Sequence, residues 1–327
     1  MEKPVDKDVF LVLEGGVVQC EICSHLCRIK PGRLGFCNSK KNVDGKLFTL
    51  NYGAISMLFD DFVERVPLFH FLPDTHTLGV ACASCNFTCP WCINWEQSQN
   101  AVDNADVAYL SIPSILEEAR LYESKSISLT YTEPTVWYDF AIDLAAKAHE
   151  VGLPVILNTN GYMTPKISEK FAKHVDAVNV DIKGFSEEFY QKYCSSHLQP
   201  VLNSAKRLQD LGLHIEIGNL VIQGVNDDPK EIRQLAAWIK ENLGEDTPLI
   251  FERFFPHYKF SENHDVTPAS TLLKAHEVAL NEGLNYVYVW GLGTEPRNVV
   301  TTYCPSCKKE VLRRDYALPW EAYYIEP

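Results

Sequence analysis

The chain has 327 residues, of which 46% are hydrophobic and 11% aromatic, which is enough to bury a large core. It carries 30 basic and 43 acidic residues, a net charge of −13, without a Lys/Arg cluster, and this argues against nucleic acid as a partner. There is no apolar run of about eighteen residues, and the first residues, "MEKPVDKDVF", lack a signal core, so we expect a cytoplasmic protein with no membrane partner.

The chain contains 11 cysteines, and they are clustered. In order, the groups are Cys20, Cys23, Cys27 and Cys37, then Cys82, Cys85, Cys89 and Cys92, and finally Cys304 and Cys307. Clustering in a cytosolic enzyme favours metal ligands over disulfides. Cys194 stands alone, and we interpret it as a small buried residue.

After the first cysteine group, short apolar runs alternate with helical patterns. The predicted strands are 77–82, 126–132, 154–161, 177–184, 214–222, 248–255 and 285–291. The predicted helical regions are 111–124, 136–152, 165–175, a segment ending near Gly212, 228–244 and 268–283. Ser111 is a candidate cap for the first of these helices, and Pro113 falls in its first turn.

Six β-α units with continuously apolar strands predict a parallel sheet covered by helices, because right-handed crossovers place a helix outside each strand. We predict an α/β fold, a partial (β/α)6 barrel resembling a TIM barrel, over residues 77–293. Residues 1–76 then form an N-terminal extension with cysteines, and residues 294–327 form a C-terminal segment. A doubly wound open sheet is the alternative.

In such a barrel the chemistry gathers where strands end and loops begin. Every unusual segment lies at such an end, in the order "CNFTCPWC", "YTEP", "NTNG", "DIKG", "IQGVND" and "FFPHYK". This coincidence carries more weight than any single motif.

The loop after the first strand has the spacing Cys85-x3-Cys89-x2-Cys92, with Trp91 beside the last cysteine. A [4Fe–4S] cube has four irons, so three thiolates leave one iron open to a small molecule. The pattern resembles the radical S-adenosylmethionine (SAM) superfamily, which implies that SAM binds the open iron near Trp91 and is cleaved to a 5′-deoxyadenosyl radical. In the alternative, Cys82 is a fourth ligand and closes an electron-carrier cluster, but a buried thiol suits its position at a strand end.

Two further segments fit the same resemblance. "YTEP" looks like the Gly-Gly-Glu-Pro motif of the superfamily with its glycines replaced, which implies that Glu133 holds the SAM amino group. The alternative is an acidic residue at a helix start, before Pro134. Asp181 and Lys183 match a pair in activating enzymes of glycyl-radical proteins that faces SAM and the substrate; a surface ion pair is the alternative.

The remaining strand ends offer weaker candidates for cofactor contacts. Asn158, Asn160 and Gly161 can supply amide and backbone contacts, while Val221 and Ile222 can face the adenine. Such turns occur in many α/β proteins.

A closer resemblance covers residues 20–312. The strings that carry it are "NYG", "PLFHFLPD", "CNFTCPWCINWEQSQ", "YTEPT", "FFPHYK" and "YCPSC", with the early "C-x2-C-x3-C…GxxGxC". They resemble the radical SAM enzyme of the AmmeMemoRadiSam system, whose members are often labelled as homologues of pyruvate formate-lyase activating enzyme. Many relatives have a His where this chain has Phe255, and His257 is a possible substitute.

The outer cysteines raise the question of a second metal. "CEIC" and "YCPSC" each resemble a zinc knuckle, so Cys20, Cys23, Cys304 and Cys307 can form one closed site. In the other partition, Cys20, Cys23, Cys27 and Cys37 form a local site for zinc or an auxiliary iron–sulfur cluster. His25 is a further nearby candidate, and the commoner use of knuckles favours zinc.

We therefore predict a radical SAM enzyme with a [4Fe–4S] cluster. Its substrate is an unidentified protein or small molecule, such as a protein glycine, and its electron donor is a protein such as flavodoxin or ferredoxin. The alternative is a non-catalytic iron–sulfur or zinc scaffold for electron transfer or partner binding. That alternative requires Glu133, Asp181 and Lys183 to be incidental.

Overall fold

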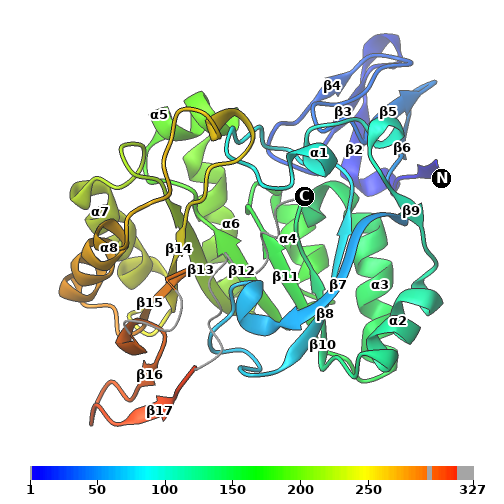
Figure 1. Ribbon diagram of the computed structural model, residues 1–327. Coiled ribbons are helices and arrows are strands. Elements are labelled where there is room, and N and C mark those ends of the chain that lie inside the picture. Colours follow the sequence, from blue (N-terminus) through cyan, green and yellow to red (C-terminus); the bar gives the residue numbers. More distant parts are fainter. Residues whose placement is uncertain (1, 293–296, 315–327) are drawn as a thin grey trace.

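A nine-stranded sheet forms the centre of the computed structural model, which describes residues 2–292 and 297–314 (Figure 1). Its strands are β7 (Ala54–Phe62), β8 (His76–Cys82), β9 (Ala108–Tyr109), β10 (Ser126–Leu129), β11 (Val155–Thr159), β12 (Ala177–Asp181), β13 (His214–Val221), β14 (Leu249–Arg253) and β15 (Val287–Trp290). Their order in space is β15-β14-β13-β12-β11-β10-β8-β7-β9. All neighbouring pairs from β8 to β15 are parallel, whereas β7 is antiparallel to β8 and β9.

Helices connect the parallel strands. The principal ones are α2 (Ile112–Leu121), α3 (Tyr138–Glu150), α4 (Pro165–Phe171), α6 (Leu198–Asp210), α7 (Pro229–Asn242) and α8 (Ala269–Glu282). Ser111 caps α2 by accepting a hydrogen bond from the backbone N–H of Ser114 at 3.3 Å, and Pro113 lies in the first turn. Each predicted strand and helical region is confirmed, with ends shifted by a few residues.

The order of the parallel strands distinguishes between the two predicted folds. From β8 to β15 each strand lies beside the next parallel strand in the chain. A doubly wound sheet needs a point at which this order reverses, and here the order runs in one direction throughout. The edges of the described sheet are β15 and β9, so the barrel is partial and open, as predicted.

The first fifty residues form two small antiparallel sheets beside the main one (Figure 1). Their strands are β1 (Lys3–Pro4), β6 (Lys46–Thr49) and β5 (Lys40–Val43) in one sheet, and β2 (Phe10–Val12), β3 (Val18–Cys20) and β4 (Arg28–Ile29) in the other. The sequence did not single out β7, which joins the nine-stranded sheet although it precedes residue 77. The predicted division into three regions stays a prediction.

The last described residues form a hairpin of β16 (Thr302–Tyr303) and β17 (Glu310–Leu312). Figure 1 shows this hairpin at the opposite side of the molecule from β3 and β4. Residues 293–296 and 315–327 of the predicted C-terminal segment lie outside the described residues. No helix in the described part of the chain has the length and apolar character needed to cross a membrane.

Candidate active site

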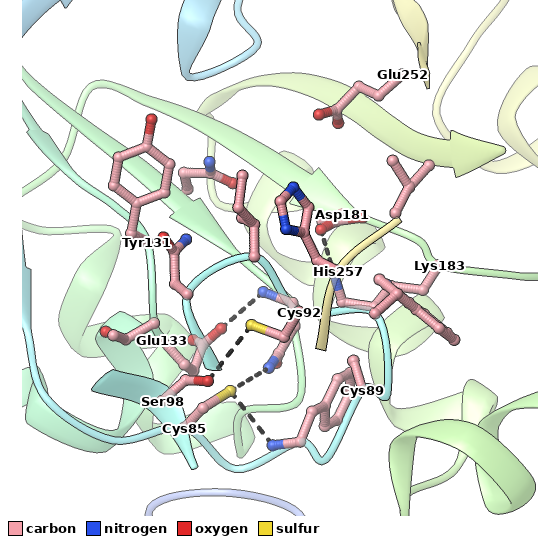
Figure 2. A pocket seen from close by; sticks show the side chains of 18 of the residues that line it. Cys85, Cys89, Cys92, Ser98, Tyr131, Glu133, Asp181, Lys183, Glu252 and His257 are labelled. Carbon is pink, nitrogen blue, oxygen red and sulfur yellow. Dashed lines mark hydrogen bonds and ion pairs between the residues drawn. The ribbon is translucent and has the colours of Figure 1, made fainter. Parts of the chain in front are cut away.

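A pocket lies at the carboxyl ends of the parallel strands, where their loops meet (Figure 2). Its lining includes Cys85, Cys89, Trp91 and Cys92 after β8; Tyr131, Thr132 and Glu133 after β10; Asn158, Thr159 and Asn160 of β11 and its loop; Asp181 and Lys183 of β12 and its loop; Leu220 of β13; and Glu252, Arg253, Phe254, Phe255 and His257 of β14 and its loop. Five of the six predicted strand-end segments therefore converge on one space, whereas "IQGVND" contributes no lining residue. Figure 2 shows the cysteines, Glu133 and the Asp181–Lys183 pair around it.

The three predicted cluster ligands form one electrostatically linked group. Burial raises the pKa of Cys85, and the charges of Cys89 and Cys92 raise it further. Cys89 likewise raises the pKa of Cys92, after burial. Among residues 2–292 and 297–314, no group of three or more His, Cys, Asp or Glu side chains is placed to hold a metal ion. In a [4Fe–4S] cube each thiolate binds a different iron.

Cys82 and Cys194 flank this group in different ways. Cys82 ends β8 with a fully buried side chain and does not line the pocket, which agrees with the predicted structural role. Cys194 is also fully buried, but its sulfur lies 3.8 Å from that of Cys89. This contact is the largest of the causes that lower the pKa of Cys89. The prediction of a small buried residue is therefore confirmed, and folding in addition brings its thiol to Cys89, which is far away in the chain.

The "YTEP" segment keeps a glycine-like backbone without glycine. Tyr131 and Thr132 both have φ of 43°, in the left-handed region that glycine adopts most easily. The Thr132 hydroxyl donates a hydrogen bond to the Cys82 carbonyl at 2.5 Å, and the Tyr131 ring lies 4.9 Å from that of Phe59. Non-glycine residues pay about 1–3 kcal/mol for such a backbone, which these contacts help to hold in place. The missing glycines therefore do not remove the conformation that the resemblance implies.

Glu133 has a structural role and also lines the pocket. Its Oε1 accepts hydrogen bonds from the Thr135 N–H at 3.0 Å and from the hydroxyls of Thr135 and Thr159, each at 2.6 Å. Its Oε2 accepts one from the Asn160 N–H at 2.8 Å. Burial raises the Glu133 pKa, and these hydrogen bonds oppose that shift. Glu133 thus caps the helical turn that begins at Pro134, as the alternative proposed. Its Oε2 retains capacity for a further donor.

Asp181 and Lys183 form an ion pair in the pocket wall. Burial lowers the Lys183 pKa, but the charge of Asp181 and then that of Cys89 act against it, and the net shift is well upward. Asp181 Oδ1 is buried and has no hydrogen-bond partner among the described residues. The side chains of Lys183 and Asp181 are only 16% and 26% exposed and line the pocket, so the alternative of a surface pair is wrong.

Asn158, in β11, and Asn160, directly after β11, have different partners. Asn158 donates to the Thr130 hydroxyl at 3.2 Å. Asn160 donates to the Asn86 side-chain oxygen at 2.8 Å and lies 3.9 Å from the Cys85 sulfur. Asn160 therefore positions the cysteine loop, whatever else it contacts.

Two predicted cofactor contacts need correction. Val221 and Ile222 are buried in the hydrophobic core and do not line the pocket, whereas Leu220 does. Side chains alternate between the faces of a strand, so Val221 points away from the face of Leu220, whereas Ile222 follows the end of β13 and is not governed by this alternation.

Glu252 is a pocket residue that the sequence did not reveal. Burial raises its pKa to about 8, the Asp181 charge acts in the same direction, and Lys183 opposes them. Burial therefore favours the protonated form of this carboxyl group. Its place near the end of a predicted strand was the available signal, but adjacent Arg253 offered an equally plausible candidate. Phe255 and His257 also line the pocket, and burial lowers the pKa of His257.

The outer cysteines separate into two groups. Cys304 and Cys307 belong to the turn of the β16–β17 hairpin, across the molecule from Cys20 and Cys23 (Figure 1). The predicted site that joins all four is therefore wrong. Cys20 and Cys23 instead interact electrostatically with Cys27 and Cys37, and the site made of these four cysteines stays a prediction.

Comparisons with known proteins agree with this arrangement. A model of the Radical SAM superfamily matches residues 81–236. The uncharacterized protein MJ0808 of Methanocaldococcus jannaschii is 39% identical over 303 residues, which cover 92% of this chain and 89% of that protein. The pyruvate formate-lyase-activating enzyme of Streptococcus mutans is 25% identical over 167 residues, which cover 48% of this chain and 63% of that enzyme.

A solved structure extends the likeness of the fold. The radical SAM methyltransferase from Sphaerobacter thermophilus aligns with a TM-score of 0.56 and 14% identity, covering 70% of each chain. At this identity the similarity concerns the fold alone.

Proposed function

Because the chain belongs to the radical SAM superfamily, we propose that its pocket binds SAM beside a [4Fe–4S] cluster and supports reductive SAM cleavage. The observation that carries this proposal is the convergence of three thiols, a buried glutamate and an ion pair from separate strand ends. A non-catalytic scaffold has no need for these polar groups in one pocket, so the scaffold alternative is disfavoured.

The residues of the chain have distinct proposed roles. Cys85, Cys89 and Cys92 hold the cluster, and the free capacity of Glu133 Oε2 suits the SAM ammonium group. Lys183 supplies a positive charge for an anionic group of SAM or substrate, while Asp181 keeps that lysine charged. When bound, the open-iron cluster supplies the electron that cleaves SAM to a 5′-deoxyadenosyl radical, which takes a hydrogen atom from the substrate.

For the substrate, we propose a carbon-bound hydrogen of the kind found in a protein glycine. The likeness to pyruvate formate-lyase-activating enzyme over about half the chain supports this class. A one-electron donor protein such as flavodoxin or ferredoxin would supply the electron. The AmmeMemoRadiSam resemblance also stays a proposal, supported by the quoted strings.

The test is anaerobic incubation of the reconstituted protein with SAM and dithionite, followed by measurement of 5′-deoxyadenosine. We expect product from the parent protein and from Cys82→Ala, whose side chain is buried outside the pocket. Cys85→Ala, Cys89→Ala and Cys92→Ala should each yield none. Absence of product from a parent protein with a full cluster would refute the function, and loss of the cluster in Cys82→Ala would refute the ligand assignment.

A further inference from the structure

A second group of four thiols lies in the N-terminal region, outside the pocket. The backbone N–H of Cys20 donates to the Cys27 carbonyl at 2.9 Å, which brings the ends of the first loop together. Cys23 lies within this loop, and its carbonyl accepts from the Leu26 N–H at 3.1 Å. The second loop turns back so that the Phe36 N–H lies 3.5 Å from the Cys27 sulfur. Cys37 follows directly, so all four thiols come from two adjoining turns.

These thiols are close to one another and free of disulfides. Each of them lies close enough to the other three for a direct electrostatic interaction. The interactions link every pair among the four. Cys20 and Cys23 are only 6% and 7% exposed, so free thiolates at these positions would be costly without a compensating cation.

We propose that Cys20, Cys23, Cys27 and Cys37 bind a second [4Fe–4S] cluster, closed by one thiolate on each iron. As in the pocket, the thiols are mutually close, yet no described group of three or more is placed to hold a metal ion. A tetrahedral zinc site brings all four sulfurs within about 2.3 Å of one point, whereas a cube keeps them on separate irons. The cluster thus fits this arrangement better than the zinc that the knuckle spacing favoured.

A buried lysine supplies a matching charge. Lys40 is 1% exposed and donates to the Thr49 hydroxyl and the Val136 carbonyl, each at 2.6 Å. No carboxylate among the described residues forms an ion pair with it, but its charge interacts with Cys20. A buried ammonium needs a nearby anion, and a cluster with four thiolates is anionic. A set of neutral thiols would leave Lys40 uncompensated.

The second site adjoins the loop that carries the first. Cys23 forms a β-bridge with Met163, and the Ser24 N–H donates to the Tyr162 carbonyl at 3.2 Å. The His25 Nε2 lies 2.7 Å from the carbonyl oxygen of Asn86, which follows Cys85 in the chain. Four thiolates already supply one ligand for each iron, so the proposed cluster does not require His25. The second cluster would therefore hold the segment that supports the SAM-site loop.

The test is anaerobic reconstitution with iron and sulfide, followed by measurement of iron, sulfide and zinc per folded chain. The parent should hold about eight irons, and Cys23→Ser and Cys27→Ser about four each. Cys89→Ser should also hold about four, but it should lose the SAM-dependent change in electron paramagnetic resonance that Cys27→Ser retains. Cys307→Ser is the matched control and should keep about eight, because Cys307 lies on the distant hairpin.

Four outcomes would overturn the second cluster. They are a folded parent that holds only about four irons, one equivalent of zinc in place of the second set of irons, full iron in folded Cys27→Ser, and loss of iron in Cys307→Ser. The parent measurement decides the matter even if the variants fail to fold. The proposal does not rest on SAM cleavage, because Cys89→Ser would retain the second cluster even if the pocket proved inactive.

Discussion

Replacing Glu133 with glutamine separates its capping role from its proposed role in SAM binding. In the folded protein Oε1 accepts three hydrogen bonds and Oε2 accepts one, from the Asn160 N–H. The glutamine carbonyl can replace Oε1, but its NH2 group then faces the Asn160 N–H, donor against donor. A buried donor without an acceptor costs about 1–3 kcal/mol, so the free energy of unfolding should fall by that amount.

The effect of this substitution on the affinity for SAM is separate from its effect on stability. The SAM ammonium would lose a charge-assisted hydrogen bond worth about 1.5–3 kcal/mol, so the Kd should rise about 10- to 100-fold. Urea unfolding measures the stability, and anaerobic isothermal titration calorimetry on the reconstituted protein measures the affinity. The matched control is Thr159→Val, which removes one donor to Oε1 at 2.6 Å but keeps the carboxylate.

Thr159→Val should lose about 1–3 kcal/mol of stability and bind SAM nearly as well as the parent. If Glu133→Gln loses stability but binds SAM with an unchanged Kd, Glu133 is only a cap. The assignment of Oε2 to the ammonium group is then refuted.

Three further changes test other contacts. Cys194→Ala should make the midpoint potential of the pocket cluster about 20–60 mV more negative, because it removes a hydrogen bond to the Cys89 sulfur worth about 0.5–1.5 kcal/mol. Cys194→Ser should keep most of this hydrogen bond. An unchanged potential in a redox titration of Cys194→Ala would argue against that bond. Burial raises the pKa of Glu252 from 4.5 to about 8, so between these pH values the folded protein retains a proton that the unfolded chain releases. The free energy of unfolding should therefore fall as the pH rises from 4.5 to about 8. Glu252→Gln should flatten this dependence in urea titrations at several pH values, and an unaltered slope contradicts the pKa shift. Arg314→Met should cost about 3–5 kcal/mol of stability, because it breaks a fully buried ion pair in which the Glu64 carboxylate lies 3.1 Å from Arg314. The double variant with Glu64→Gln should recover part of that stability, and equal stability of the two variants would exclude the charge as the cause.

Local patterns in the sequence were sufficient to predict the chain of β-α units and the principal ligand loop. Hydrophobic periodicity depends on near neighbours, so β10 to β15 and their helices could be predicted from short windows. Cys85, Cys89 and Cys92 fall within one short loop, so their spacing alone limits where the thiols can lie. The position of Glu133 at a strand end likewise follows from the alternation of elements.

The tertiary structure determined which groups from distant segments lie together. It brought Cys194 against Cys89, set Glu252 beside Asp181, and separated Cys304 from Cys20. In the folded protein β7 also pairs with the main sheet, and Leu220 rather than Val221 lines the pocket. These outcomes depend on strand pairing and register, which are properties of several segments together, and one step in register exchanges the faces of a strand. The sequence by itself therefore determined the ligand loop and the order of elements, while long-range packing determined which other groups surround them.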